Sequence, residues 1–313
     1  MPVDHPAHSL KHTPMPSTLD QFIAFAASRP VPLSVADIRR GTVEFDHLLN
    51  AGERPVGVRP FERVAIAPER GPTPTLTGVV ARPDDQHTHP VLLFIHGGGW
   101  VTGSPHVYRR FITRLAEQGF VVLAPDYRLA PEHPFPAALN DCTACLDWIA
   151  REAAARHSDP RRLVIVGDSA GANLAAAICG LAPGLFRAAA FIYGIFNQRS
   201  LRQSITGLAG GEGLRIMQEA YLGRSPNAAT LDDPRTSPIH SVAKWPSTLL
   251  TVATDDLLAP QSHEAAVALA RAGVVHELDV VANVPHGFVQ NERWPQCLPA
   301  IARLGQFLHA HSQ

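Results

Sequence analysis

Runs of consecutive apolar residues alternate with helical patterns from about residue 60 to the end of the chain. Continuous apolar runs are typical of strands in a parallel sheet, because helices cover both faces of such a sheet. The predicted strands are FERVAIAPE, TLTGVVARP, VLLFIHG, FVVLAPDY, LVIVGDS, AAAFIYG, TLLTVATDD and VVHELDVVANV. Apolar positions at helical spacing predict helices near residues 107–118, 136–156, 170–182, 262–272 and 296–310. This alternation predicts an α/β doubly wound sheet whose first two strands form an antiparallel start.

Two segments interrupt the alternation. Residues 1–55 contain two helical patterns, STLDQFIAFAA and LSVADIRRGTVEFDHLLN, and the second begins at a capping Ser34. About fifty residues between YGIF and STLLTV have no clear sheet strand. Open α/β sheets bind ligands at the carboxyl ends of their strands, where an insertion of this kind would lie. We therefore expect residues 1–55 and 197–240 to form a helical cap over a core of residues 56–196 and 241–313.

Composition excludes several classes of function. The 313 residues are 45% apolar, and 27 Lys and Arg nearly balance 28 Asp and Glu, so a nucleic-acid partner is not expected. No apolar run approaches the roughly 18 residues of a membrane span. The first residues lack the apolar region of a secretory signal, so a cytoplasmic location is expected. Cys142 and Cys145 form a C-x-x-C within a helical pattern, for which we expect a structural role and no metal.

The segment Gly167–Gly171 reads GDSAG and joins a predicted strand to a predicted helix. A G-x-S-x-G in that context predicts a sharp turn that lifts the serine hydroxyl above the sheet edge. The serine needs a strained backbone there, and its neighbours two positions away must be small. Ser169 is therefore the candidate nucleophile. The alternative interpretation of these five residues alone is an ordinary tight turn with a capping serine.

Three further features favour the nucleophile. The segment FIHGGGW places His96 and three glycines after a strand, where exposed N–H groups can bind an oxyanion. His286, in VPHGFV after the last predicted strand, supplies the base that a serine hydroxyl needs. The segment TVATDD ends a strand with Asp255 and Asp256, one of which should orient the histidine. We choose Asp256, with Asp255 as the fallback.

Four segments of the chain resemble one known family. HGGGWVTGS, DYRLAPEHPFPAALND, GDSAGANLA and HGF are similar to the motifs of the hormone-sensitive-lipase family of α/β-hydrolases, over about residues 75–290. The resemblance implies a mostly parallel eight-stranded sheet flanked by helices, with a helical cap. It also implies a nucleophile, a general base and an orienting acid at Ser169, His286 and Asp256, and an oxyanion hole formed by the N–H groups of Gly98, Gly99 and Ala170.

The implied activity is hydrolysis of small, short-acyl esters through an acyl-enzyme, with no metal or organic cofactor. An amidase or aryl formamidase could use the same triad. A non-catalytic ligand receptor is a third interpretation, which the presence of His286 beside Ser169 disfavours. We expect Asp168 to accept backbone N–H groups and His96 to brace the glycine loop.

The cap has the weakest motifs, so the substrate pocket is the least determined part of the sequence. The candidate pocket-lining residues are Trp100, Phe22, Phe25, Phe196, Leu208, Leu214 and Met217. Trp100 either narrows the pocket beside the oxyanion hole or packs against the cap. A homodimer is also conceivable, through residues 274–281 at the sheet edge and the C-terminal helix.

Overall fold

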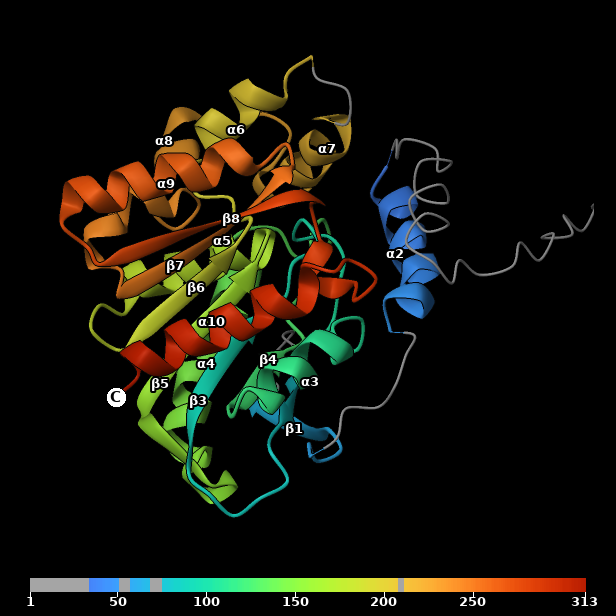
Figure 1. Ribbon diagram of the computed structural model, residues 1–313. Helices are drawn as coiled ribbons and strands as arrows, with labels where there is room; N and C mark the ends of the chain where they lie inside the picture. Colours follow the sequence, from blue (N-terminus) through green and yellow to red (C-terminus); the bar gives the residue numbers. More distant parts are fainter. Residues whose placement is uncertain (1–33, 51–56, 68–74, 208–210) are drawn as a thin grey trace, which may run out of the picture. The chain divides into compact units, whose positions relative to one another are not determined.

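Eight strands form one sheet in the part of the chain that the computed structural model describes, residues 34–50, 57–67, 75–207 and 211–313 (Figure 1). These residues all lie in one structural unit, Val31–Gln313. In pairing order the strands are β1 (Glu62–Ala67), β2 (Leu76–Ala81), β4 (Val121–Pro125), β3 (His89–Ile95), β5 (Ser158–Asp168), β6 (Ala188–Ile192), β7 (Ser247–Asp255) and β8 (His276–Pro285). Strand β2 is antiparallel to β1 and β4, and the others pair in parallel. The predicted sheet with its antiparallel start is confirmed.

Nine α-helices occur among the described residues. They are α2 (Val35–Leu49), α3 (Arg109–Glu117), α4 (Ala137–Glu152), α5 (Ala170–Leu181), α6 (Gln198–Ile205), α7 (Gly211–Leu222), α8 (Ala228–Asp232), α9 (Ala259–Ala272) and α10 (Cys297–His311). Three short 3₁₀-helices are η1 (Ala154–Arg156), η2 (Pro238–Lys244) and η3 (Phe288–Gln290). Ser34 caps α2 as predicted, since its hydroxyl accepts the N–H of Asp37. None of the helices within these ranges is long and apolar enough to cross a membrane.

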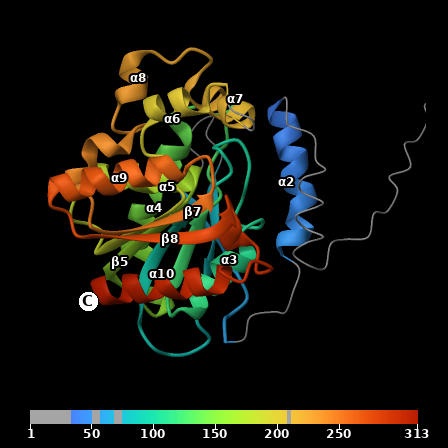
Figure 2. The same ribbon diagram turned by 45° about the horizontal axis from the view of Figure 1, so that its top comes forward.

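The central strands are apolar on both faces because helices cover both faces. In β3, Val91, Leu93 and Ile95 belong to the buried cluster that includes α4, α5 and α9, whereas Leu92 and Phe94 belong to the cluster that includes α3 and α10. Figure 2 shows these two layers of helices on opposite sides of the sheet. All four cysteines are free and buried. The C-x-x-C pair therefore lies in the core layer of α4, which agrees with a structural role.

The insertion between β6 and β7 contains helices only, as far as its residues are described. It forms α6, α7 and α8 and then enters η2. Helix α7 packs against α2, so the described part of the N-terminal segment contacts the insertion. Phe22, Phe25 and Leu208 lie outside the described residues. The division of the chain into a core and a two-part cap stays an interpretation.

Candidate active site

Ser169 lies at the sharp turn between β5 and α5. Its backbone has φ +54° and ψ −121°, a strained combination for a residue with a side chain, and its N–H donates to the carbonyl of Ile192 (2.9 Å). A Cβ atom on Gly167 would lie 2.4 Å from the carbonyl oxygen of Gly171, and one on Gly171 would lie 2.0 Å from that of Ile95. The two glycines are therefore required by backbone contact, which is the physical reason for the G-x-S-x-G pattern.

His286 follows the last residue of β8 and contacts Ser169. The hydroxyl of Ser169 donates to Nε2 of His286 (2.9 Å), and Nδ1–H of the same ring donates to Oδ2 of Asp256 (2.7 Å). Asp256 is only 3% exposed at its side chain, whereas the histidine side chain is 38% exposed. The carboxylate is thus buried, and one edge of the imidazole remains open to an incoming molecule.

The two adjacent aspartates have different surroundings. Oδ1 of Asp256 also accepts the N–H of Leu258 (2.9 Å), which holds the carboxylate toward the histidine. Asp255 is exposed, and it accepts the hydroxyl of Thr254 (3.0 Å). The geometry therefore selects Asp256 over its neighbour as the partner of His286.

Opposing effects act on the pKa of His286. Desolvation of the ring lowers the pKa, but the negative charge of Asp256 and the hydrogen bond to it outweigh this effect and raise the pKa above its ordinary value. The charge of Asp168 adds to the increase. A base with a raised pKa is a stronger proton acceptor for the serine hydroxyl.

The glycine loop follows β3, which pairs in parallel with β5, and Ile95 is aligned with Gly167. The loop therefore emerges beside the serine turn. Gly98 has φ +111°, Gly99 has φ +60°, and a Cβ atom on Gly98 would lie 2.2 Å from the carbonyl oxygen of Thr102. Within the described ranges, no backbone hydrogen bond of this loop uses the N–H of either glycine. These groups, with the N–H of Ala170 at the start of α5, are free to bind an oxyanion.

His96 supports the backbone of the glycine loop. The ring is buried and stacks on Tyr127 at 4.2 Å, and Nδ1–H donates to the carbonyl of Gly97 (2.8 Å). Burial lowers the pKa of His96 to about 4, so the ring is neutral at ordinary pH. The hydroxyl of Tyr127 donates to the carbonyl of His96 (2.8 Å). The residue thus holds the loop backbone, as expected.

Three predicted pocket-lining residues lie around the glycine loop or on α7. Trp100 is buried and stacks flat on Tyr221 of α7, with ring centroids 4.6 Å apart and planes 2° apart. Met217 of the same helix lies against Gly99, since a Cβ atom there would be 1.8 Å from the thioether sulfur. Leu214 is half-buried on α7. Of the two roles considered for Trp100, packing is the one that the contacts describe, since the ring stacks on α7.

Phe196 was expected at the pocket wall, and the structure places it in the core instead. Its side chain is fully buried against Phe191 (5.8 Å) and Trp245 (5.6 Å). Its position after β6 allowed either direction, because an apolar residue at the end of a strand can face the core or the site. Packing against the surrounding aromatic rings stabilises Phe196 in the core.

Tyr193 is a neighbour of the site that the sequence interpretation missed. Its ring lies 4.5 Å from the ring of His286, and its backbone has φ +38°. The residue directly follows β6, and β6 pairs with β5. That position was the available signal, because neighbouring parallel strands end at the same edge of the sheet.

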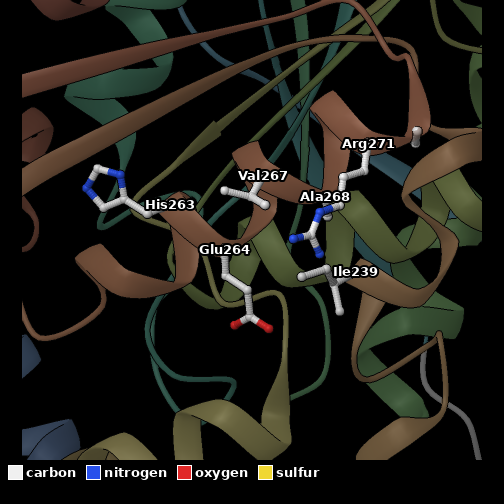
Figure 3. Close-up of a pocket in the computed structure, with 7 residues that line it drawn as sticks. Ile239, His263, Glu264, Val267, Ala268 and Arg271 are labelled. Carbon is white, nitrogen blue, oxygen red and sulfur yellow. The ribbon is translucent and has the colours of Figure 1, made fainter.

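A shallow pocket of about 670 Å³ lies elsewhere, beside α9 and η2 (Figure 3). It is lined by Ile239, His263, Glu264, Val267, Ala268, Arg271 and Ala272. None of the predicted site residues that the structure describes lines it. The carboxylate of Glu264 already accepts hydrogen bonds from Asn197 (2.6 Å) and Ser200 (2.7 Å), so it serves to attach the insertion to α9.

Comparison with known proteins agrees with this geometry. The profile of a family described as having the alpha/beta hydrolase fold matches residues 92–290, more than half of the chain. The chain belongs to the α/β-hydrolase family. Among solved structures, this α/β-hydrolase is similar to an esterase from Pyrobaculum calidifontis (25% identity, TM-score 0.80, covering 92% of this chain and 97% of that one). It is also similar to a bacterial heroin esterase (26% identity, TM-score 0.80, covering 96% and 99%).

Curated relatives of this α/β-hydrolase match over shorter lengths. Tuliposide A-converting enzyme b3 of Tulipa gesneriana is 34% identical over 163 residues, which cover 48% of this chain and 42% of that protein. The carboxylic ester hydrolase LipN of Mycobacterium tuberculosis is 31% identical over 235 residues, covering 70% and 62%. The chain thus spans less than two thirds of the length of these relatives. The name of LipN and the names of the similar solved esterases agree with the resemblance to the hormone-sensitive-lipase family, which is confirmed.

Proposed function

We propose that this chain is a carboxylesterase that hydrolyses small esters through an acyl-serine intermediate. The observation that carries the proposal is the continuous hydrogen-bond chain from Ser169 through His286 to Asp256 beside the glycine loop. A hydroxyl, an imidazole and a buried carboxylate in this order form the arrangement that activates serine for acyl transfer. The esterases among its relatives support the same reaction.

Each group has a role that follows from its position. Oγ of Ser169 attacks the ester carbonyl while Nε2 of His286 takes the hydroxyl proton, and Asp256 stabilises the imidazolium that forms. The N–H groups of Gly98, Gly99 and Ala170 bind the negative oxygen of the tetrahedral intermediate, and each such donor contributes about 3 kcal/mol. The imidazolium then protonates the departing alcohol. Water attacks the acyl-serine with the same base, which releases the carboxylic acid and restores the serine.

The preference for short acyl chains is also part of this proposal. The Met217 side chain lies against Gly99, and the Trp100–Tyr221 stack packs α7 close to the loop. Bulk at these positions limits the room beside the reacting carbonyl. We assign α2 and residues 197–240 to a cap that closes over this space.

Initial rates on p-nitrophenyl acetate, butyrate, octanoate and palmitate test the proposal, with Ser169→Ala as the matched blank. We expect rates that peak at acetate or butyrate and fall at least about 10³-fold in the variant. Hydrolysis of formanilides with no ester turnover would instead indicate the amidase alternative. Ligand binding that survives in Ser169→Ala, with no turnover by the natural chain, would indicate a receptor.

Self-association and location are separate parts of the proposal. Strand β8 ends the described sheet, and Leu278 and Val280 on it are 37% and 49% exposed. An unpaired edge with exposed apolar side chains can pair with a second copy of the chain. Light scattering on the natural protein and on Val280→Lys tests a dimer, which the lysine should dissociate. A cytoplasmic location remains a prediction from the sequence that cell fractionation would test.

A further inference from the structure

Asp168, next to the candidate nucleophile, has no exposed surface. Both oxygens of its carboxylate accept hydrogen bonds. Oδ1 accepts the N–H of Gly97 in the glycine loop (2.7 Å). Oδ2 accepts the hydroxyl of Tyr108 at the start of α3 (3.0 Å) and Nε2–H of Gln290 (3.2 Å). One side chain therefore joins the serine turn, the glycine loop and the segment that follows His286.

The contact with the glycine loop depends on a missing side chain. A Cβ atom on Gly97 would lie 2.8 Å from Oδ2 of Asp168, 2.9 Å from its carbonyl oxygen and 2.9 Å from the hydroxyl of Tyr108. Heavy-atom contacts of this kind are too short for any other residue. The backbone of the loop thus rests directly on the carboxylate, one residue before the first N–H of the oxyanion hole.

The contact with the histidine segment is equally direct. Gln290 is four residues beyond His286, and its backbone N–H donates to the carbonyl of Gly287 (3.0 Å), which closes the intervening turn. Its side-chain amide donates both to Asp168 and to the hydroxyl of Tyr108 (2.9 Å). The two carboxylate oxygens of Asp168 therefore set both the position of the base, His286, and the position of the glycine loop.

The charged groups that surround Asp168 leave His286 as its one positive neighbour in the described part of the chain. Burial raises the pKa of Tyr108, Tyr127 and Tyr193 well above the ordinary tyrosine value, so all three are neutral. His96, below the loop, is neutral above a pKa of about 4. The carboxylate of Asp168 interacts with protonated His286 and helps to raise its pKa. A buried carboxylate that faces a forming imidazolium stabilises the charge that develops during attack.

We propose that Asp168 is a positioning residue of the reaction. Its carboxylate holds Gly97, and through it the N–H groups of Gly98 and Gly99, in register with His286, and its charge favours the imidazolium. The inference rests on the proposed function, because it assigns roles to the same loop and the same base. It goes beyond the triad in making the ionised form of a fourth residue necessary for full activity.

The ionisation of Asp168 falls in an accessible range. Burial raises the pKa of this carboxyl, although the hydrogen bonds from Tyr108 and Gly97 lower it, and the result is about 6. Two opposite shifts are therefore expected in the acid limb of the pH profile of kcat/KM, the pH range in which activity is lost on acidification. Asp168→Asn removes the charge that favours the imidazolium, so the pKa of His286 falls and the limb moves to lower pH. Tyr108→Phe removes a donor to the carboxylate, so Asp168 loses its charge at a higher pH and the limb moves up.

The test is the pH dependence of kcat and KM for p-nitrophenyl butyrate in these two variants, with Asp255→Asn as the matched control. Asp255 is an exposed carboxylate beside another member of the triad. We expect Asp168→Asn to lower kcat about 10- to 100-fold with KM within about twofold, because the single amide oxygen cannot accept from Gly97 and also from Tyr108 and Gln290. The limb should move to lower pH in Asp168→Asn, to higher pH in Tyr108→Phe, and stay in place in Asp255→Asn.

A merely structural role predicts a different result, in which both variants lose activity at every pH and neither limb moves. That outcome would overturn the proposal. If Asp168→Asn does not fold, Gln290→Met replaces it, since it removes another donor to Oδ2 and should move the limb upward like Tyr108→Phe. If Ser169→Ala is inactive and neither limb moves, this inference alone is rejected. An active Ser169→Ala would reject the proposed function itself.

Discussion

The sheet edge that carries the triad and the helices above it are built in different ways. At the edge, polar side chains such as Asp168 and Asn173 are buried, and backbones approach so closely that no Cβ atom fits on Gly167 or Gly171. In the helices α2 and α6–α8, which we call the cap, charged side chains pair at the surface. Examples are Arg199–Asp232, Arg215–Glu212 and Arg39–Glu132, with side chains 35–55% exposed.

This difference suggests that the sheet edge carries out the reaction and that the cap selects the substrate. Exposed ion pairs contribute roughly 0–1 kcal/mol each, so many sequences can build a cap of this kind. Buried polar contacts at the edge have few substitutes, because an unpaired partner would lose its hydrogen bond without gaining water. We therefore expect substitutions at the edge to abolish turnover and substitutions in the cap to alter which ester is hydrolysed.

The largest expected effect distinguishes the two adjacent aspartates. Asp256→Asn should lower kcat about 10³- to 10⁴-fold, because a neutral amide neither stabilises the imidazolium nor holds its tautomer. The amide oxygen can still accept the N–H of Leu258, so the fold should persist. Asp255→Asn should stay within about twofold of the natural chain. Steady-state rates on p-nitrophenyl butyrate measure both, and equal losses would contradict the assignment.

A smaller effect separates the two glycines that we propose for the oxyanion hole. Gly98→Ala places a Cβ atom against the backbone carbonyl of Thr102, so we expect a loss of kcat/KM of about 100-fold or more. Gly99→Ala meets only the movable side chain of Met217, at a φ of +60°, and should lose about 10-fold.

Adding Met217→Ala tests whether the obstacle belongs to the edge or to the cap. It should restore most of the activity of Gly99→Ala and none of that of Gly98→Ala. Recovery in both double variants would show that the cap, and not the loop backbone, restricts Gly98. Circular dichroism of each variant provides the control for folding.

Stability gives a third comparison, between a buried and an exposed carboxylate. Glu292, six residues after His286, accepts from Arg114 (2.8 Å) and pairs with Arg110 and Arg114, all of them mostly buried. Burial alone would raise the pKa of Glu292, but hydrogen bonds from the two arginines lower it to about 2. Glu292→Gln should therefore reduce the free energy of unfolding by about 2 kcal/mol at pH 7.

The pH dependence of this loss has a definite sign. A depressed pKa contributes stability above the ordinary glutamate value, and the contribution disappears as the pH falls from 4.5 toward 2. Urea unfolding at several pH values should show that the difference in the free energy of unfolding between the natural chain and Glu292→Gln decreases in acid. Glu212→Gln, in the exposed pair on α7, should leave the unfolding midpoint unchanged.

The smallest effect concerns the attachment of α2. Arg39 donates from Nε to the carbonyl of Val101 (2.8 Å) and from a terminal nitrogen to that of Ala130 (3.0 Å), so it links α2 to the segment after the glycine loop. Arg39→Ala should raise KM about threefold with little change in kcat. Arg40→Ala is the matched control, because Arg40 pairs only with Asp37 on its own helix among the residues described here. A fall in kcat with an unchanged KM would instead indicate that Arg39 positions the catalytic residues.

Much of the fold and the chemistry was predictable because the signals are local. A strand covered on both faces must be apolar throughout, so the sequence shows each strand by itself. The strained turn at Ser169 needs glycines at fixed offsets, and the glycine loop needs backbone angles that other residues avoid. The choice of Asp256 over Asp255 rested on family resemblance, and the burial of one carboxylate beside His286 gave it a physical basis.

The sequence alone predicted the sheet, the succession of strands and helices along the chain, and the candidate site residues, since the strand patterns and the motifs around these residues are local. Only the tertiary structure decided that Phe196 belongs to the core and that Trp100 stacks on Tyr221. It also revealed that Asp168 joins Gly97, Tyr108 and Gln290. These contacts connect residues far apart in the chain, and the residue types involved occur throughout the sequence, so no local pattern distinguishes them before the strands and loops come together.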